Sequence, residues 1–236
     1  MDVLKSREVA LTSVFTALVT VTTIMFQVYI PETKGYFNLG EVAVYLTALL
    51  LGPRVGAFAG GVGSALADLI TGYSIYAPAT LVIKGLEGYI VGKLSRSLRK
   101  RPYLAKPLSL AVPVLIFIMI TAIGTIFYTG TFELSSYPPI YSSAFQVEAW
   151  MWVTLAAVAA FVVGYESHRA GKTSLYVISM IAGGAVMVTG YFLYESALYG
   201  PAPAAVEVPF NIGQVVVGII GGLALYEPLS KIAKEK

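Results

Sequence analysis

Long apolar segments that carry almost no charge are the feature that most constrains the fold of this chain. Eight of them follow one another along the 236 residues, at 9–30, 38–51, 55–72, 78–94, 107–129, 145–165, 173–197 and 207–229. A helix that crosses a bilayer needs roughly 20 apolar residues, and all but the segment 38–51 come close to that length or exceed it. Only 12% of the residues are charged, about half the share found in soluble domains. The chain is therefore predicted to be an integral membrane protein.

The same segments favour helices over strands. Backbone groups in lipid must be satisfied within the protein, which leaves helices or a closed β-barrel as spanning structures. A barrel needs segments of about 10 residues with alternating polarity, and no segment here alternates in that way. We therefore predict an all-α protein with eight transmembrane segments, forming a single membrane domain over residues 1–236.

The positions of the basic residues predict the orientation in the membrane. If the N-terminus is inside and the segments alternate, fourteen of the sixteen Lys and Arg residues fall on the inner side. The other two are Lys34, in an outer loop, and Lys84, within a segment. Because Lys and Arg accumulate in cytoplasmic loops, we expect a multi-pass protein of the cell membrane with both termini cytoplasmic. The net charge of +3 then reflects this topology and not nucleic-acid binding.

Several kinds of chemistry find no support in the sequence. The chain has no Cys and a single His, His168, which excludes thiolate metal sites and argues against a zinc site. Gly171-Lys172-Thr173-Ser174 resembles the end of a phosphate-binding loop, but Glu166 stands where that motif needs glycine. A pairing of Ser64 with His168 would place a mid-helix serine against an inner-loop histidine, so a hydrolytic Ser–His pair is not expected. We predict no metal, no cofactor and no enzymatic activity.

Ionisable residues inside the apolar segments are the strongest functional indication. Asp68 lies one helical turn before Gly72, and Lys84 lies about 9 Å below the outer loop if 78–94 is a helix. Glu87 is one turn deeper than Lys84 on the same face. Such residues mark either an internal ion-pair network or a polar site between helices, and charges within membranes are functional candidates by default.

Two similar octets place further amide and carboxyl groups near the outer surface of the membrane. The octet beginning Phe37-Asn38 resembles the octet beginning Phe210-Asn211, and each has Glu or Gln three residues after its Asn. Each octet is expected to open a helix that descends from the outside, with aromatic walls supplied by Tyr36, Tyr73 and Tyr76. We predict an outer substrate pocket formed by Asn38, Glu41, Asp68, Tyr73, Tyr76, Lys84, Glu87, Asn211 and Gln214. A pocket near Gln146 and Glu148 is the alternative position.

Small residues at helical spacing predict close helix packing. Gly56, Gly60, Gly63 and Ala67 form one smooth face of the segment 55–72, which allows a neighbouring helix to approach closely. Ser13 and Ala17 form a second small pair in the first segment. It is suited either to packing within the protein or to a partner.

A set of motifs resembles the substrate-binding S components of energy-coupling factor (ECF) transporters, in particular the riboflavin and hydroxymethylpyrimidine branch. The matching residues cover about 36–96 and 180–229. The motifs are Asn38-Leu39-Gly40-Glu41, Leu51-Gly52-Pro53-Arg54-Val55-Gly56-Ala57, Gly63-Ser64-Ala65-Leu66-Ala67-Asp68-Leu69, Tyr76-Ala77-Pro78-Ala79-Thr80, Lys84-Gly85-Leu86-Glu87-Gly88 and Glu207-Val208-Pro209-Phe210-Asn211. Because the family has six helices, the resemblance implies a six-helix bundle with an inserted helical hairpin at 107–165.

The resemblance also implies a function. Such subunits bind a vitamin or vitamin precursor from outside, and associate with a transmembrane coupling protein and two cytoplasmic ATPases. Ser13 and Ala17 occupy the region where the family docks its coupling protein. The alternative is a self-sufficient secondary carrier for a small heterocyclic solute. Inverted repeats would favour a carrier, whereas the octets here run in the same direction.

Overall fold

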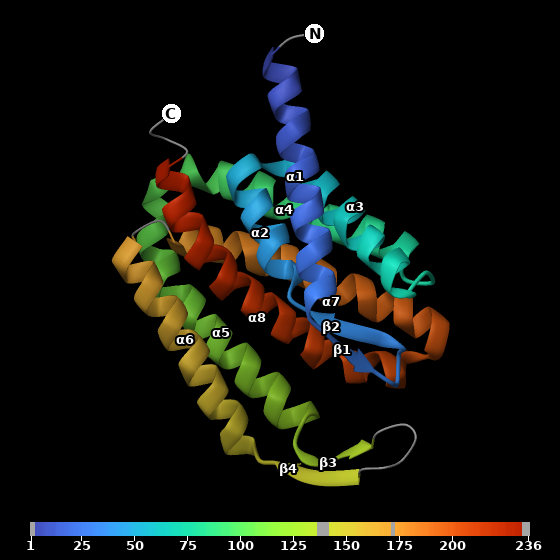
Figure 1. Ribbon diagram of the computed structural model, residues 1–236. Coiled ribbons are helices and arrows are strands. Elements are labelled where there is room, and N and C mark those ends of the chain that lie inside the picture. Colours follow the sequence, from blue (N-terminus) through green and yellow to red (C-terminus); the bar gives the residue numbers. More distant parts are fainter. Residues whose placement is uncertain (1–2, 136–141, 171–172, 233–236) are drawn as a thin grey trace. The chain divides into compact units, whose positions relative to one another are not determined.

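The computed structural model describes residues 3–135, 142–170 and 173–232, which form eight α-helices, one 3₁₀-helix and two β-hairpins (Figure 1). The prediction of a mostly all-α membrane protein is confirmed. The elements in chain order are α1 (Val3–Met25), β1 (Gln27–Ile30), β2 (Gly35–Asn38), α2 (Gly40–Leu51), α3 (Pro53–Thr71), α4 (Ala77–Arg99), the 3₁₀-helix Pro102–Leu104, α5 (Ala105–Phe127), β3 (Gly130–Ser135), β4 (Ser142–Val147), α6 (Ala149–Ala170), α7 (Thr173–Tyr199) and α8 (Pro201–Ile232).

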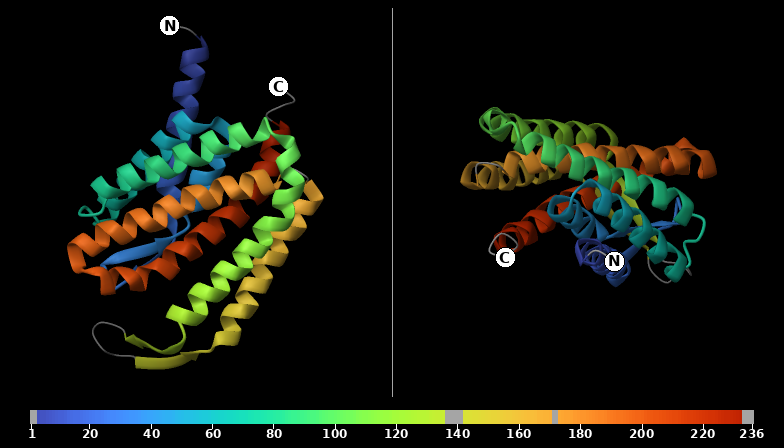
Figure 2. Two further views of the ribbon diagram at one scale, coloured as in Figure 1. Left: turned by 180° about the vertical axis from the view of Figure 1, so that it is seen from behind. Right: turned by 90° about the horizontal axis from the view of Figure 1, so that it is seen from above.

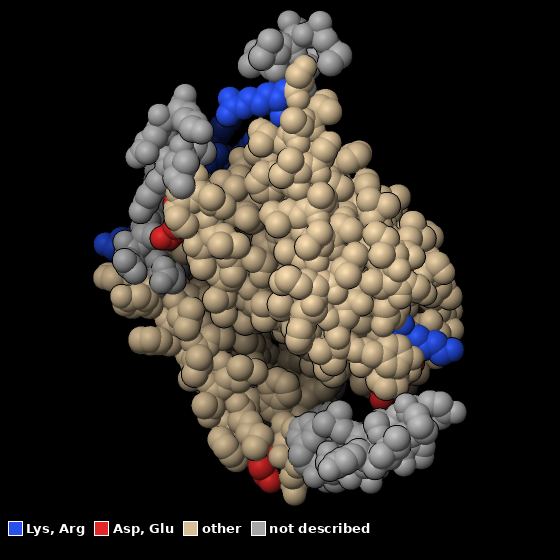
Figure 3. All heavy atoms as spheres, in the orientation of Figure 1, with Lys and Arg blue, Asp and Glu red and all other residues tan. Residues whose placement is uncertain are grey.

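Four helical stretches are long and apolar enough to cross a membrane within the described part of the chain. They are Ser6–Met25, Pro102–Ile126, Thr173–Tyr199 and Pro201–Ser230. Shorter apolar stretches occupy Gly40–Leu51 and Ala149–Tyr165. The face seen in Figure 3 consists almost entirely of uncharged residues, as a lipid-facing surface requires.

The two hairpins correct the sequence analysis at the ends of three segments. The segment 9–30 is helical only to Met25, and 27–30 pairs antiparallel with 35–38, Gln27 opposite Asn38. Likewise β3 pairs with β4, Gly130 opposite Val147, so 145–165 becomes helical only from Ala149. The expectation of helix throughout these segments was wrong because a hairpin satisfies the backbone of both its strands by mutual pairing, at positions beyond the ends of the long helices.

The chain divides into two compact units, Met1–Pro102 with Leu175–Lys236, and Tyr103–Ser174. The second unit holds the antiparallel pair α5 and α6. There Gly124 lies against the ring of Trp152, whose Nε1 donates a hydrogen bond of 2.7 Å to the carbonyl oxygen of Tyr128. This unit contains the segment 107–165 that we expect to be an insertion, and that relation to the family stays a prediction.

Close helix contacts build the first unit. A Cβ added at Gly60 of α3 would lie 2.9 Å from the carbonyl oxygen of Lys84 in α4, and one at Gly56 would lie 2.9 Å from that of Gly88. Gly63 instead faces α1, with the carbonyl oxygen of Thr16 at 2.8 Å from its added Cβ. The predicted small face of α3 therefore serves two neighbours, and it brings α4 and its charged residues close to the centre of the unit.

Helix α7 lies between α4 and α8 (Figure 2). Its Gly183 contacts Val91 and the Glu87 carbonyl of α4, while its Gly184 contacts Val215 of α8. The sharp reversal between α2 and α3 occurs at Gly52, whose φ of 85° lies in the left-handed region that glycine adopts without strain. These contacts set α2, α3, α4, α7 and α8 around one polar space.

Candidate functional site

The first unit contains a polar cavity of about 30 Å³, room for about two water molecules. Six of the nine predicted substrate-binding residues line it, and they come from four different elements or their flanks: Asn38, Asp68, Tyr76, Lys84, Asn211 and Gln214. Tyr36, predicted as an aromatic wall, also lines the cavity, and further lining residues that were not predicted are Thr23, Ser64, Thr80, Tyr191 and Glu207. The structure thus brings together polar side chains that are far apart in sequence.

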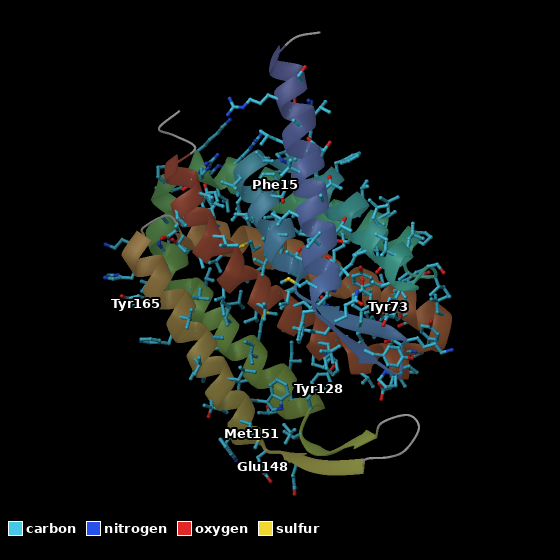
Figure 4. The ribbon with its side chains drawn as sticks, viewed as in Figure 1. Phe15, Tyr73, Tyr128, Glu148, Met151 and Tyr165 are labelled. Carbon is cyan, nitrogen blue, oxygen red and sulfur yellow. The ribbon has the colours of Figure 1, made fainter. Side chains whose placement is uncertain are left out.

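The three remaining predicted residues lie next to the lining. Glu41 and Glu87 are in contact with Lys84. Tyr73, labelled in Figure 4, follows α3 and packs against Tyr36, with ring centroids 4.4 Å apart and ring planes inclined by 42°. It is half-buried, whereas Tyr36 is buried.

One side of the cavity is formed by what we call the Lys84 cluster, made of Lys84, Glu41, Glu87 and Tyr45. Nζ of Lys84 forms an ion pair with Glu41 and lies 3.3 Å from Oε2 of Glu87, while the hydroxyl of Tyr45 donates to Oε1 of Glu87 at 2.9 Å. The exposed fractions of Lys84, Glu41 and Glu87 are 4%, 1% and 0%. The sequence left open whether these charges form an internal ion-pair network or a polar site between helices. The structure shows features of both, since Lys84 belongs to an ion-pair network and also lines the cavity.

Asp68 connects the cavity to the β1–β2 hairpin. The hydroxyl of Tyr36, in β2, donates a hydrogen bond of 2.5 Å to Oδ1 of Asp68. Burial, and next the charge of Asp68, raise the pKa of Tyr36 above its usual value, so the hydroxyl stays protonated and remains a donor. The second oxygen, Oδ2, is buried without a hydrogen-bond partner. Asp68 therefore keeps one acceptor free at the cavity.

The amide groups of Asn38, Asn211 and Gln214 form another side of the cavity. Nε2 of Gln214 donates to Oδ1 of Asn211 at 2.9 Å, and Oε1 of Gln214 accepts from the backbone N–H of Asn38 at 3.2 Å. Oδ1 of Asn38 accepts from the N–H of Gly40 at 2.8 Å. Nδ2 of Asn211 is buried with no partner, which leaves one amide donor unused at the cavity wall.

The prediction that both octets open a helix was wrong. Asn38 is the last residue of β2, and its side chain accepts from the backbone where α2 begins at Gly40. Asn211 lies well inside α8, which begins at Pro201. The two asparagines nevertheless meet at the same cavity, because the hairpin returns β2 toward the middle of α8.

A pair of buried carboxyl groups that was not predicted as part of the site forms what we call the Glu207 cluster: Glu207, Glu195 and Thr33. Glu207 lines the cavity and accepts a hydrogen bond from the hydroxyl of Thr33. Its neighbour Glu195 is 0% exposed and lies against Glu207, and no hydroxyl, amide or ammonium group donates to either of its carboxyl oxygens. The hydroxyl of Tyr76 donates to the carbonyl oxygen of Thr33 at 2.6 Å. Both glutamates are charges inside apolar segments, the same signal that indicates Asp68 as a functional residue.

The predicted docking residues are accessible. Ser13 and Ala17 are both exposed on α1, and the hydroxyl of Ser13 donates to the carbonyl oxygen of Val9 at 3.1 Å. In the second unit Gln146 and Glu148, the alternative pocket position, are exposed around the end of β4; Figure 4 labels Glu148. The described residues contain no group of three or more His, Asp or Glu side chains placed to hold a metal ion.

Comparison with known proteins decides the family. The model of the S component of the ECF-type riboflavin transporter matches residues 3–149 and 140–231. The chain belongs to this family. The resemblance predicted from the motifs is confirmed, and with its apolar helices the chain is a multi-pass membrane protein of a transporter family.

Two curated proteins are similar over shorter stretches. An uncharacterized protein in the gap 3′ region of Pyrococcus woesei is 58% identical over 78 residues, which are 33% of this chain and 52% of that protein. The thiamine precursor transporter HmpT of Lactococcus lactis subsp. cremoris (strain MG1363) is 34% identical over 93 residues, 39% of this chain and 56% of that protein. Each match thus spans little more than half of the relative's own length.

Proposed function

We propose that this chain is the substrate-specificity component of an ECF-type importer, which binds a vitamin or vitamin precursor from outside in the cavity of the first unit. The observation that carries the proposal is the pair of unused groups on the cavity wall, Oδ2 of Asp68 and Nδ2 of Asn211. Leaving a buried polar group without a partner costs free energy. A ligand that offers one donor and one acceptor would recover that cost at both positions.

The proposed substrate-binding residues are the nine singled out by sequence: Asn38, Glu41, Asp68, Tyr73, Tyr76, Lys84, Glu87, Asn211 and Gln214. Lys84 has three donor protons, of which Glu41 and Glu87 engage two, and the third is left for a ligand oxygen or ring nitrogen. Glu41 and Glu87 act through Lys84, by holding its ammonium group at the cavity wall. Tyr73 and Tyr76 supply aromatic surface.

The ligand class we favour is a small, polar-edged heterocycle. A small-molecule site is typically an apolar concavity with a few placed polar groups, and this one is formed by helices with largely apolar surfaces. HmpT, the relative with a stated function, is a thiamine precursor transporter.

Transport itself requires partners in this proposal. A transmembrane coupling protein and two cytoplasmic ATPases would supply the driving force. The test is reconstitution of the purified chain alone in liposomes. We expect ligand binding without concentrative uptake, and uptake only when the coupling protein, the ATPases and ATP are added. Concentrative uptake by the chain alone, driven by an ion gradient, would establish the secondary carrier instead.

Docking of the coupling protein is proposed at Ser13 and Ala17. The double substitution Ser13→Leu with Ala17→Leu adds bulk to the exposed face of α1, so it should block assembly while leaving ligand affinity unchanged. Met25→Leu, at an exposed position near the other end of α1, is the control. Assembly of the double variant at the wild-type level would remove this part of the proposal.

The proposed topology has eight membrane helices, both termini cytoplasmic and the hairpin 107–165 inserted. Single cysteines placed in this Cys-free chain test it directly. A cysteine at Lys34 should react with an impermeant reagent added from outside, and one at Arg99 should not. Labelling of the Arg99 position from outside would refute the orientation.

A further inference from the structure

The Glu207 cluster has more acceptors than donors. Its two carboxyl groups, from α7 and α8, lie against each other, and Glu207 and Glu195 are 4% and 0% exposed. The hydroxyl of Thr33 donates to Glu207, and no hydroxyl, amide or ammonium group donates to either oxygen of Glu195. Tyr76 does not relieve this, because its hydroxyl proton is given to the carbonyl oxygen of Thr33.

No cation compensates the two carboxyl groups within the described part of the first unit. Lys84 forms its ion pairs with Glu41 and Glu87, and Lys34 is exposed on the hairpin turn. Glu32, on the same turn, adds another negative charge near Glu207. Two adjacent carboxylates in a buried place cannot both stay ionised unless a positive group or a proton joins them.

The cavity borders the Glu207 cluster, where positive charge is lacking. Glu207 is part of its wall, and the same wall carries Oδ2 of Asp68, a buried acceptor without a partner. The one basic residue among the lining side chains, Lys84, is offset by Glu41 and Glu87. The cavity is therefore net acidic, with an unused amide donor only at Asn211.

We propose that Glu207 and Glu195 form a subsite for a positively polarised nitrogen of the ligand, an exocyclic amino group or a protonated ring nitrogen, and that the pair thereby excludes phosphate esters and carboxylates. This inference rests on the proposed function and names the charge class of its ligand. A protonated ring nitrogen donates to Glu207 and supplies the positive charge that lets Glu195 behind it stay ionised, whereas an exocyclic amino group donates to Glu207 when a proton already joins the carboxyl pair. Asn211 takes an acceptor on the other edge of the ring. A phosphate group at the same place would meet two carboxyl groups with no cation to balance it.

Calorimetric titration of the purified full-length chain in detergent tests the subsite with three probes. They are an aminopyrimidine that carries a hydroxymethyl arm, the matching pyrimidinone in which a carbonyl replaces the amino group, and the phosphate ester of the aminopyrimidine. We expect the wild type to prefer the aminopyrimidine over the pyrimidinone by about tenfold or more, as for loss of a hydrogen bond to a charged group. The phosphate ester should bind about 100-fold more weakly or worse, because like charges would be juxtaposed.

The variants Glu207→Gln and Glu195→Gln keep the shape and remove the charge. Each should reduce the ratio of the affinities for the aminopyrimidine and the pyrimidinone toward one. Each should also reduce the difference in affinity between the aminopyrimidine and its phosphate ester. Glu32→Gln, an exposed carboxyl on the same hairpin, should change both ratios far less than either buried substitution, because water and salt screen its charge. If a Gln variant fails to fold, Thr33→Val provides a second route, since it keeps both carboxyl groups and should retain the wild-type preference.

Three outcomes would overturn the subsite. They are wild-type ratios in both folded Gln variants, loss of the preference in Thr33→Val, and a phosphate ester that binds as well as the unphosphorylated probe. A wild-type chain that ignores all three probes but binds riboflavin would also overturn it, while leaving the proposed function intact. A chain that binds no vitamin-type compound and copurifies with none would refute the proposed function as well.

Discussion

The Lys84 cluster and the Glu207 cluster each contain two buried carboxyl groups beside the same cavity, but they differ in the donors and charges that compensate these groups. In the first, one ammonium group stands between two carboxyl groups, and Tyr45 supplies a further donor. In the second, two carboxyl groups share one hydroxyl donor, and no hydroxyl, amide or ammonium group donates to Glu195. The first contains its own cation, and the second does not.

This difference separates stability from recognition. Removing one partner of a buried ion pair leaves an uncompensated charge, which is far more costly than never having made the pair. A substitution in a cluster that already lacks a partner costs less folding stability in the ligand-free protein. A ligand that supplies the missing partner gains more binding free energy there. We therefore expect substitutions in the Lys84 cluster to act mainly on the fold, and those in the Glu207 cluster mainly on ligand choice.

The largest expected effect is that of Lys84→Met. It leaves Glu41 and Glu87 buried without their cation, so it should lower the free energy of unfolding of the ligand-free protein by about 3–5 kcal/mol. Denaturant unfolding in detergent measures this. Adding Glu41→Gln and Glu87→Gln to Lys84→Met should recover part of the loss. A single variant as stable as the wild type would mean that the ion pairs contribute nothing to the fold.

A smaller effect is expected when the backbone beneath Lys84 is displaced. In Gly60→Ala the new Cβ would lie 2.9 Å from the carbonyl oxygen of Lys84 and 3.3 Å from Cγ1 of Val44, so α3 and α4 must separate. Overpacking of this kind costs about 1–3 kcal/mol of folding stability. In the matched control, Gly85→Ala, the nearest atom is the carbonyl oxygen of Ala57 at an ordinary 3.5 Å. Thermal melting should thus separate the two variants, and equal melting temperatures would contradict the close approach.

The smallest effect concerns the hydroxyl that holds Thr33 in the Glu207 cluster. Tyr76→Phe removes the hydrogen bond to the carbonyl oxygen of Thr33 and should cost about 0.5–1.5 kcal/mol of stability, the usual net value of one such bond. Because Tyr76→Phe, like Thr33→Val, leaves both carboxyl groups in place, the preference for the aminopyrimidine over the pyrimidinone should stay at the wild-type value. Tyr29→Phe, on an exposed ring in β1, is the control. A loss of that preference in Tyr76→Phe would show that the Thr33 donor, and not the carboxyl pair, sets ligand choice.

Much of the site could be predicted because charges inside apolar segments are conspicuous. Asp68, Lys84 and Glu87 stood out for that reason, and helical spacing correctly put Lys84 and Glu87 on one face. The glycines of α3 predicted a close neighbour, and the structure adds that α1 shares this face with α4.

What sequence could not provide was the partner of each group. Glu41 and Lys84 lie in different helices, and only packing shows that they pair. The β1–β2 hairpin was missed because its short strands merge into apolar runs, so Asn38 was assigned to a helix. Glu195 and Glu207 were overlooked near the ends of their segments, where a charge is less conspicuous.

The most direct test of the account is whether the cavity of the first unit holds the ligand. Native mass spectrometry of the purified wild type should reveal a copurified small heterocycle, whose mass identifies it. Asn211→Ala removes the unused donor at the cavity wall and should reduce the ligand-bound fraction, whereas Gln146→Ala, exposed in the second unit, should leave it unchanged. A bound fraction that is preserved in Asn211→Ala and lost in Gln146→Ala would contradict the account and locate the ligand at the second unit.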